Sequence, residues 1–123
     1  MENERRKRRS HHMHEALELQ LKATRQRGKF SAVVLTEAQG IPVAAAGDVV
    51  AAEEFAVRAP LLANGRRMWQ GTLPTECGGS EKVTISPIAT SFGCLYMCAL
   101  GGDAAQGVAE VLIASQGVSR ILA

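Results

Sequence analysis

A hairpin in the first half of the chain constrains the fold more than any other feature. Two apolar segments, residues 30–35 and 41–46, flank the short turn "EAQG", in which Gly40 is free to adopt a positive φ. A link this short joins antiparallel neighbours, because parallel strands need a long crossover connection. Pro42 has no amide hydrogen, so it predicts that the second strand either lies at a sheet edge or begins there.

Three further segments have the pattern of strands. Residues 68–73 form the first, and residues 82–89 form the second, which is predicted to break near Pro87. Residues 92–101, "FGCLYMCALG", are apolar on both faces, which is typical of a central strand covered on each side.

Three segments are predicted to be helices. The first covers residues 13–27 and ends at Gly28; its apolar face has a helical repeat and consists of Met13, Leu17, Leu21 and Thr24. The second runs from an N-cap at Asp48 to about residue 64. The third opens with the capping-box pair Asp103 and Gln106 and is predicted to end at Gly117. The inward positions predicted for this last helix are Ala104, Val108, Val111 and Leu112.

The order of these elements predicts the fold class. It is α-β-β-α-β-β-β-α, which indicates an α/β (α+β) fold with a mostly antiparallel five-stranded sheet and helices on its faces. The length of 123 residues suits one domain with a hydrophobic core.

The second predicted helix has two apolar stripes where a helix packed on one sheet needs one. Phe55 and Leu62 lie together among alanines, and a different side of the helix carries Val50, Val57 and Leu61. Two stripes imply two neighbours, and a domain of this size does not readily supply both. Pro60 falls in the helix interior, where it is predicted to remove one hydrogen bond and bend the helix.

Charge is concentrated at the start of the chain. The net charge is +2, and "ERRKRR" contains five of the fourteen basic residues, so residues 10–123 are slightly acidic. Residues 1–12 are predicted to form a basic, disordered tail ahead of a domain at 13–123. A functional contact of this tail with nucleic acid, anionic membrane or an acidic protein would use Arg5, Arg6, Lys7, Arg8 and Arg9.

The sequence predicts a cytoplasmic protein. The polar stretch after the basic start does not match the apolar core of a signal peptide, and the longest apolar run is too short to span a bilayer. Three cysteines do not make a paired framework.

Candidate chemistry is sparse. His11, His12 and His14 could bind a transition metal, but no carboxylate or thiol stands at ligand spacing, so a solvated segment is the default. Cys94 and Cys98 lie about 13 Å apart on one strand, too far for a disulfide, and are predicted to pack as small apolar residues. Cys77 lies in a loop and could be a reactive thiol, although only Glu76 and Lys82 stand near it to activate it. We therefore expect no catalytic residues, no metal and no cofactor.

The chain resembles the roadblock/dynein light chain family, a relative of the longin and profilin-like architectures. The similarity rests on "SAVVL" at residues 31–35, "GIPV" at 40–43, the Ala-rich second helix and "KVTISPIATSFGCLYMCALG" at 82–101. It covers roughly residues 14–117. The basic segment and Pro60 depart from the family pattern.

The resemblance implies a non-enzymatic platform or regulator for a small Ras-like GTPase or a motor or polarity complex. It also implies a homodimer, or a heterodimer with a related chain, in which second helices pack antiparallel and third strands join two sheets. The expected dimer interface comprises Val50, Val57, Leu61, Met68, Gln70 and Thr72. Two alternatives remain: an electrostatic adaptor that acts through the basic tail, and a small-ligand sensor, which the low aromatic content disfavours.

Overall fold

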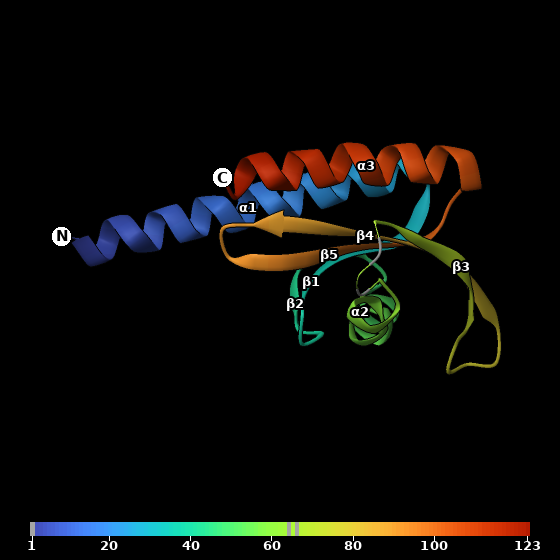
Figure 1. Cartoon of the computed structure of the whole chain (residues 1–123). Coiled ribbons are helices and arrows are strands. Elements are labelled where there is room, and N and C mark those ends of the chain that lie inside the picture. Colours follow the sequence, from blue (N-terminus) through green and yellow to red (C-terminus); the bar gives the residue numbers. More distant parts are fainter. Residues whose placement is uncertain (1, 64, 66) are drawn as a thin grey trace.

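The computed structural model describes residues 2–63, 65 and 67–123, except for the side chains of residues 2–7, 9, 10, 104 and 105. Its elements follow the predicted order: α1 (Glu2–Gly28), β1 (Phe30–Glu37), β2 (Pro42–Gly47), α2 (Val49–Ala63), β3 (Trp69–Pro74), β4 (Ser80–Thr90), β5 (Gly93–Gly101) and α3 (Ala104–Ile121). One five-stranded sheet has the strand order β2-β1-β5-β4-β3, and every pairing is antiparallel. Helices α1 and α3 cover one face of the sheet and α2 covers the other (Figure 1).

The predicted hairpin is confirmed in detail. Gly40 has a φ of 85°, and its amide donates to the carbonyl of Glu37 at 2.9 Å, which closes the turn. Pro42 lies in β2, an edge strand that has a neighbour on one side only, so a residue without an amide hydrogen is tolerated there. Strand β5 is central, as its two apolar faces predicted.

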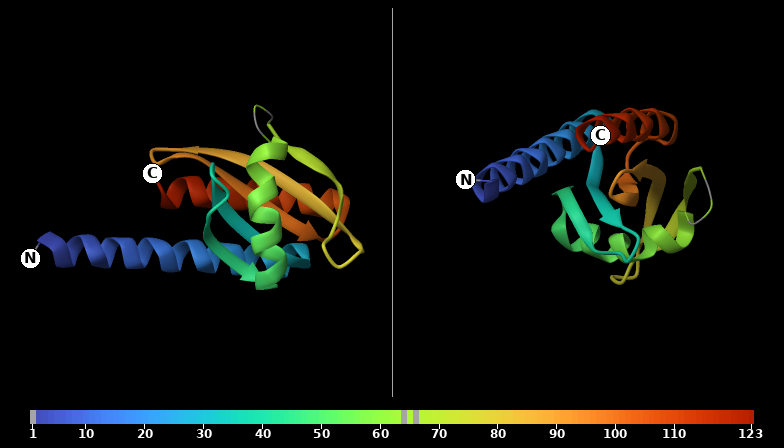
Figure 2. Two further views of the ribbon diagram at one scale, coloured as in Figure 1. Left: turned by 90° about the horizontal axis from the view of Figure 1, so that it is seen from below. Right: turned by 60° about the vertical axis from the view of Figure 1, so that its left-hand side comes forward.

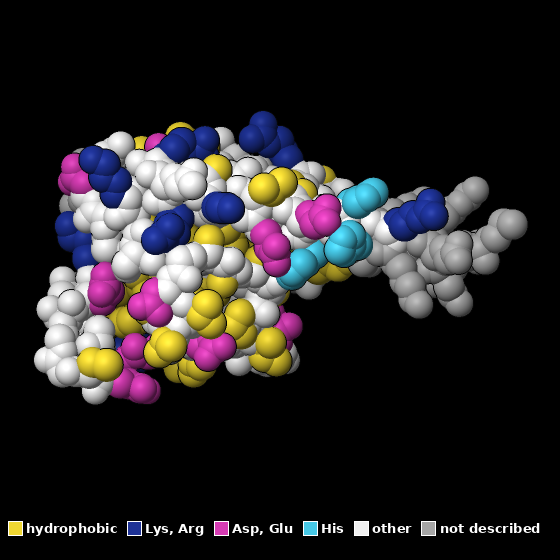
Figure 3. Space-filling model, turned by 180° about the vertical axis from the view of Figure 1, so that it is seen from behind, with side chains coloured by type: hydrophobic (Ala, Val, Ile, Leu, Met, Phe, Trp, Pro, Cys, Tyr) yellow, Lys and Arg dark blue, Asp and Glu magenta, His cyan; other side chains and the backbone are white. Residues whose placement is uncertain are grey.

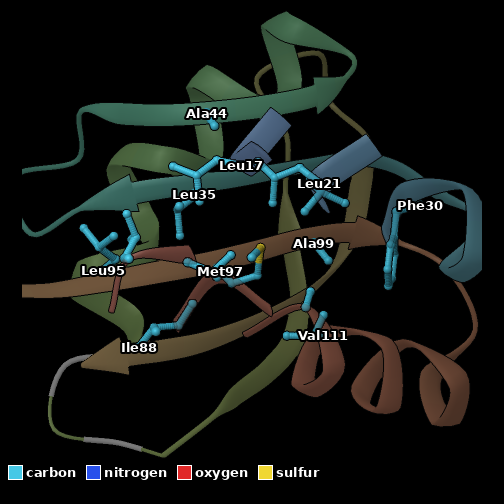
Figure 4. Packing of buried hydrophobic residues seen from close by; sticks show 14 residues of the cluster. Leu17, Leu21, Phe30, Leu35, Ala44, Ile88, Leu95, Met97, Ala99 and Val111 are labelled. Carbon is cyan, nitrogen blue, oxygen red and sulfur yellow. The ribbon is translucent and has the colours of Figure 1, made fainter. Parts of the chain in front are cut away.

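The alternation of side chains along the strands divides the core into two layers. On the α1 and α3 side, the strands contribute Leu35 and Met97, which pack against Leu21 of α1 and Val111 of α3 (Figure 4). On the α2 side, Val34, Ile85 and Cys98 pack against Phe55. The predicted apolar face of the first helix is confirmed, since Leu17, Leu21 and Thr24 are buried and Met13 is half-buried.

The first helix begins earlier than predicted. Its backbone is helical from Glu2, so the disordered tail predicted for residues 1–12 is wrong for the backbone of residues 2–12, which projects beyond the sheet (Figure 1). Glu, Arg and Lys are good helix formers and account for most of this segment. Further along α1, side chains one helical turn apart contact each other. His11 Nε2 lies 2.8 Å from the Glu15 carboxylate, and His14 Nε2 lies 2.8 Å from the Glu18 carboxylate.

Strand β4 is not broken at Pro87, contrary to the prediction. Pro87 pairs with Tyr96 of β5, whereas the pairing of β4 with β3 ends at Ile85. Pro87 therefore has a strand partner on one side only, and the position tolerates a residue without an amide hydrogen.

Helix α3 does not end at Gly117 but continues to Ile121. A Cβ atom on Gly117 would collide with the side chain of Gln20 on α1, so this glycine marks the close approach of two helices. Asp103 is the N-cap residue, but its side chain makes no capping hydrogen bond, and Gln106 instead donates to the carbonyl of Arg27. Leu112 is exposed, against prediction; Val111 is buried and Val108 half-buried, and the side chain of Ala104 lies outside the described residues.

Candidate protein-interaction surface

Helix α2 lies across the face of the sheet opposite α1 and α3 (Figure 2). Asp48 starts it as predicted: its Oδ1 accepts hydrogen bonds from the amides of Val50 at 3.1 Å and Ala51 at 3.2 Å. Gly65, just past the end, has a φ of 72°. The helix is continuous across Pro60, which is buried against the domain.

The inner stripe of α2 is small and apolar. Phe55 is its one large fully buried side chain, and the other buried positions on this face include Ala52, Ala56, Ala59 and Ala63. Alanines at these positions allow the helix backbone to lie close to the strands. The domain therefore uses this stripe for its own second core layer.

The outer stripe of α2, defined by Val50, Val57 and Leu61, is exposed. The exposed fractions of these side chains are 74%, 59% and 79%. Hydrophobic side chains, mixed with acidic ones, gather on the α2 side of the molecule in Figure 3. Apolar residues grouped in this way on one helix face typically mark a surface that another molecule covers.

The predicted interface residues of the third strand do not all lie on the side of α2. In β3, Trp69 and Leu73 pack toward the α2 layer. Gln70 lies on the opposite face, where it donates to the Thr84 hydroxyl at 3.3 Å, and Thr72 is exposed. Met68 packs against the α1 and α3 layer. What β3 offers beside α2 is its position at the edge of the sheet, where backbone groups can pair with another strand.

A set of polar contacts that the sequence analysis missed fixes α2 to the end of β3 and to the loop that follows it. Arg58 donates to the carbonyl of Pro74 at 2.8 Å, and its guanidinium lies 5.3 Å from the centre of the Phe55 ring. Glu54 accepts from the amide of Glu76 at 2.9 Å and lies 3.8 Å from Arg58. The spacing of Glu54 and Arg58 by one helical turn was the available signal. These contacts hold the edge strand beside the outer stripe.

The chain matches no protein-family model and no curated protein. It is similar to solved structures of MglB from Myxococcus xanthus (TM-score 0.60, 9% identity, 88% of each chain) and of the gliding protein MglB from Thermus thermophilus (TM-score 0.64, 14% identity, 89% of this chain and 90% of that one). It is also similar to the roadblock/LC7 domain from Streptomyces avermitilis, with a TM-score of 0.61 and 23% identity over 85% of this chain and 96% of that chain. The chain has the roadblock fold.

The histidines and basic residues that the sequence analysis singled out do not form a common site among the described residues. All three histidines lie on α1, and His11 and His14 each contact a glutamate there. Among the described residues, no three metal-ligating side chains come together. Of the basic residues predicted to make electrostatic contacts, Arg8 is exposed, and the side chains of the others lie outside the described residues: Arg5, Arg6, Lys7 and Arg9.

The three cysteines are free, and they differ in exposure. Cys98 packs in the α2 layer, where burial raises the pKa of its thiol to about 12. Cys94 is exposed beside the β4–β5 turn, so its predicted role in packing the central strand is wrong. A hydrogen bond from the Tyr96 side chain to Cys94, together with burial, raises the pKa of Tyr96. Within the described part of the chain, no helix has the length and apolar character needed to cross a bilayer.

Proposed function

We propose that the protein is a dimeric, non-enzymatic interaction module in which a second roadblock-like chain, in the first instance a second copy of itself, covers the outer stripe of α2. The observation that carries the proposal is the exposure of Val50, Val57 and Leu61 on a helix whose other face is already buried. The adjacent edge strand β3 offers backbone groups for pairing two sheets into one. One of the structurally similar proteins is described as MglB with a tetrameric arrangement, which supports self-association of this fold.

The test is sedimentation equilibrium at tens of micromolar protomer. Wild type should sediment as a dimer, and Val57→Asp and Leu61→Asp should give folded monomers, because a carboxylate buried at the centre of an apolar interface has no partner. Leu19→Asp is the matched control, since Leu19 is 67% exposed on α1, away from this stripe. A wild-type monomer at these concentrations would remove the proposal.

We further propose that the dimer scaffolds or regulates a small Ras-like GTPase, or a motor or polarity complex that contains one. The roadblock fold and its similarity to a gliding protein support this role. A titration of the dimer into a small Ras-like GTPase loaded with a fluorescent GTP analogue tests binding, and single-turnover hydrolysis separates a regulator from a scaffold. Failure of every such GTPase of the same organism to bind at tens of micromolar would exclude this part while leaving the dimer intact.

A second candidate function is electrostatic. Because α1 continues to Glu2, the basic segment is carried away from the sheet, where it can reach nucleic acid or an anionic membrane (Figure 1). Deletion of residues 1–12 should then abolish binding to duplex DNA or to phosphatidylserine vesicles at low salt. Equal binding by both forms contradicts this function.

The free thiols of all three cysteines support the proposal that the protein works in the reducing cytoplasm.

A further inference from the structure

A groove of about 550 Å³ lies at the end of the sheet from which α1 projects, separate from the outer stripe of α2. Four segments distant in sequence enclose it: α1, the β1–β2 turn, the β4–β5 turn and the end of α3. The sheet order places β1 beside β5, which brings the two turns together. None of the interactions proposed above uses this groove.

The floor of the groove is apolar and its rim exposes an aromatic ring. Leu17, Leu95 and Leu122 line the groove and are almost fully buried. Phe92, in the β4–β5 turn, also lines it but is 68% exposed, and Val43 is half-buried. An exposed aromatic beside an apolar depression is the arrangement that anchors a partner's side chain.

The carboxylate of Glu37 gives the groove a negative charge that favours a cationic partner. Glu37 pairs in register with Leu95, lines the groove and is half-buried, yet it makes no ion pair with any described residue. His14, the other ionisable side chain of the rim besides Cys94, is already paired with Glu18 at 2.8 Å. A partly desolvated carboxylate is stabilised by a cation, and the face of Phe92 also attracts one.

We propose that this groove receives a segment of a partner protein that presents a large apolar side chain next to a lysine or arginine. The apolar group would occupy the floor over Leu95, and the cation would pair with Glu37. A protein partner fits better than a small molecule. Phe92 stands exposed at the rim of the groove, so a ligand confined to the floor would leave its ring in solvent, whereas a protein surface would cover it. All residues belong to one chain, so the inference does not depend on dimerisation.

The test uses two matched probes, a 14-residue helical peptide of leucine and lysine and its counterpart of leucine and glutamate. Each is titrated into ¹⁵N-labelled full chain and followed by amide chemical shifts. The lysine peptide should shift the amides of Ala38, Gly93 and Leu95 and bind at least tenfold more tightly than the glutamate peptide. Equal affinity of the two peptides, or shifts confined to α2, would overturn the proposal.

Charge reversal sharpens the result. Glu37→Lys should invert the preference between the peptides, whereas Glu53→Lys, at an exposed position of α2, should leave it unchanged. Ala38→Trp should block the mouth and weaken both peptides; should it fail to fold, Phe92→Ala tests the same rim by a loss of affinity. Octylamine is the small-molecule probe, and binding as tight as that of the lysine peptide would make the groove a small-ligand site and refute a protein partner. Sedimentation of the Glu37, Ala38 and Phe92 variants should be unchanged, which keeps this result separate from the dimer.

Discussion

Gly40 offers the sharpest test of how the β1–β2 turn is positioned against α2. Its φ of 85° is unfavourable for alanine by about 1–2 kcal/mol. A Cβ atom there would also lie 3.0 Å from the Cα atom of Val57, a backbone atom that cannot rotate away. Alanine also restricts the unfolded chain more than glycine does, which offsets about 0.4–1 kcal/mol of this cost. About 1 kcal/mol of the conformational cost remains, and the forced contact with Val57 adds about 1 kcal/mol, the low end for overpacking, so we expect Gly40→Ala to lower the free energy of unfolding by about 2 kcal/mol.

The control is Gly78→Ala. Gly78 has a similar φ of 89°, but a Cβ atom on it would meet nothing within 4 Å, so only the conformational part of the cost remains, about 1 kcal/mol. Asparagine tolerates positive φ, so Gly78→Asn should recover much of that loss while Gly40→Asn should not. Urea unfolding at one fixed protomer concentration measures all four variants, since self-association would otherwise shift the midpoints. Equal costs for Gly40→Ala and Gly78→Ala would refute the role of the contact with α2.

Two further predictions concern single side chains. Asp48→Ala should cost about 1 kcal/mol in urea unfolding, because the amides of Val50 and Ala51 lose their acceptor, while Asp48→Asn should retain most of the stability; an equal loss in both variants would contradict the capping role. At pH 8, iodoacetamide should label Cys77 and Cys94 readily and spare Cys98, whose pKa of about 12 leaves almost no thiolate. Because this folded pKa lies above the ordinary thiol value, the stability linked to protonated Cys98 is fully present below that value and is lost as the pH rises toward 12, so Cys98→Ala should flatten the alkaline fall in stability.

Local patterns predicted most of the fold because each depends on neighbours in sequence. The "EAQG" turn, the cap at Asp48 and the two stripes of α2 are all decided within a few residues, and the structure confirms each. The errors arose where a distant segment determines the outcome. Gly117 has the sequence signature of a helix end, but its role comes from Gln20 on α1, nearly a hundred positions away. Pro87 is tolerated because the pairing of β3 with β4 does not extend past Ile85.

The candidate sites differ in the same way. The outer stripe of α2 was predictable because a helix repeat places Val50, Val57 and Leu61 together without any knowledge of the fold. The groove was not, since Glu37 and Phe92 become neighbours of one cavity only after β1 and β5 pair. The sequence marks Glu37 as an ordinary residue at the end of a strand. Its importance lies in partial burial without an ionic partner among the described residues, a property that only the assembled sheet and helices create. Charge reversal at Glu37 therefore tests a consequence of the tertiary structure, whereas Val57→Asp tests a consequence of the sequence pattern alone.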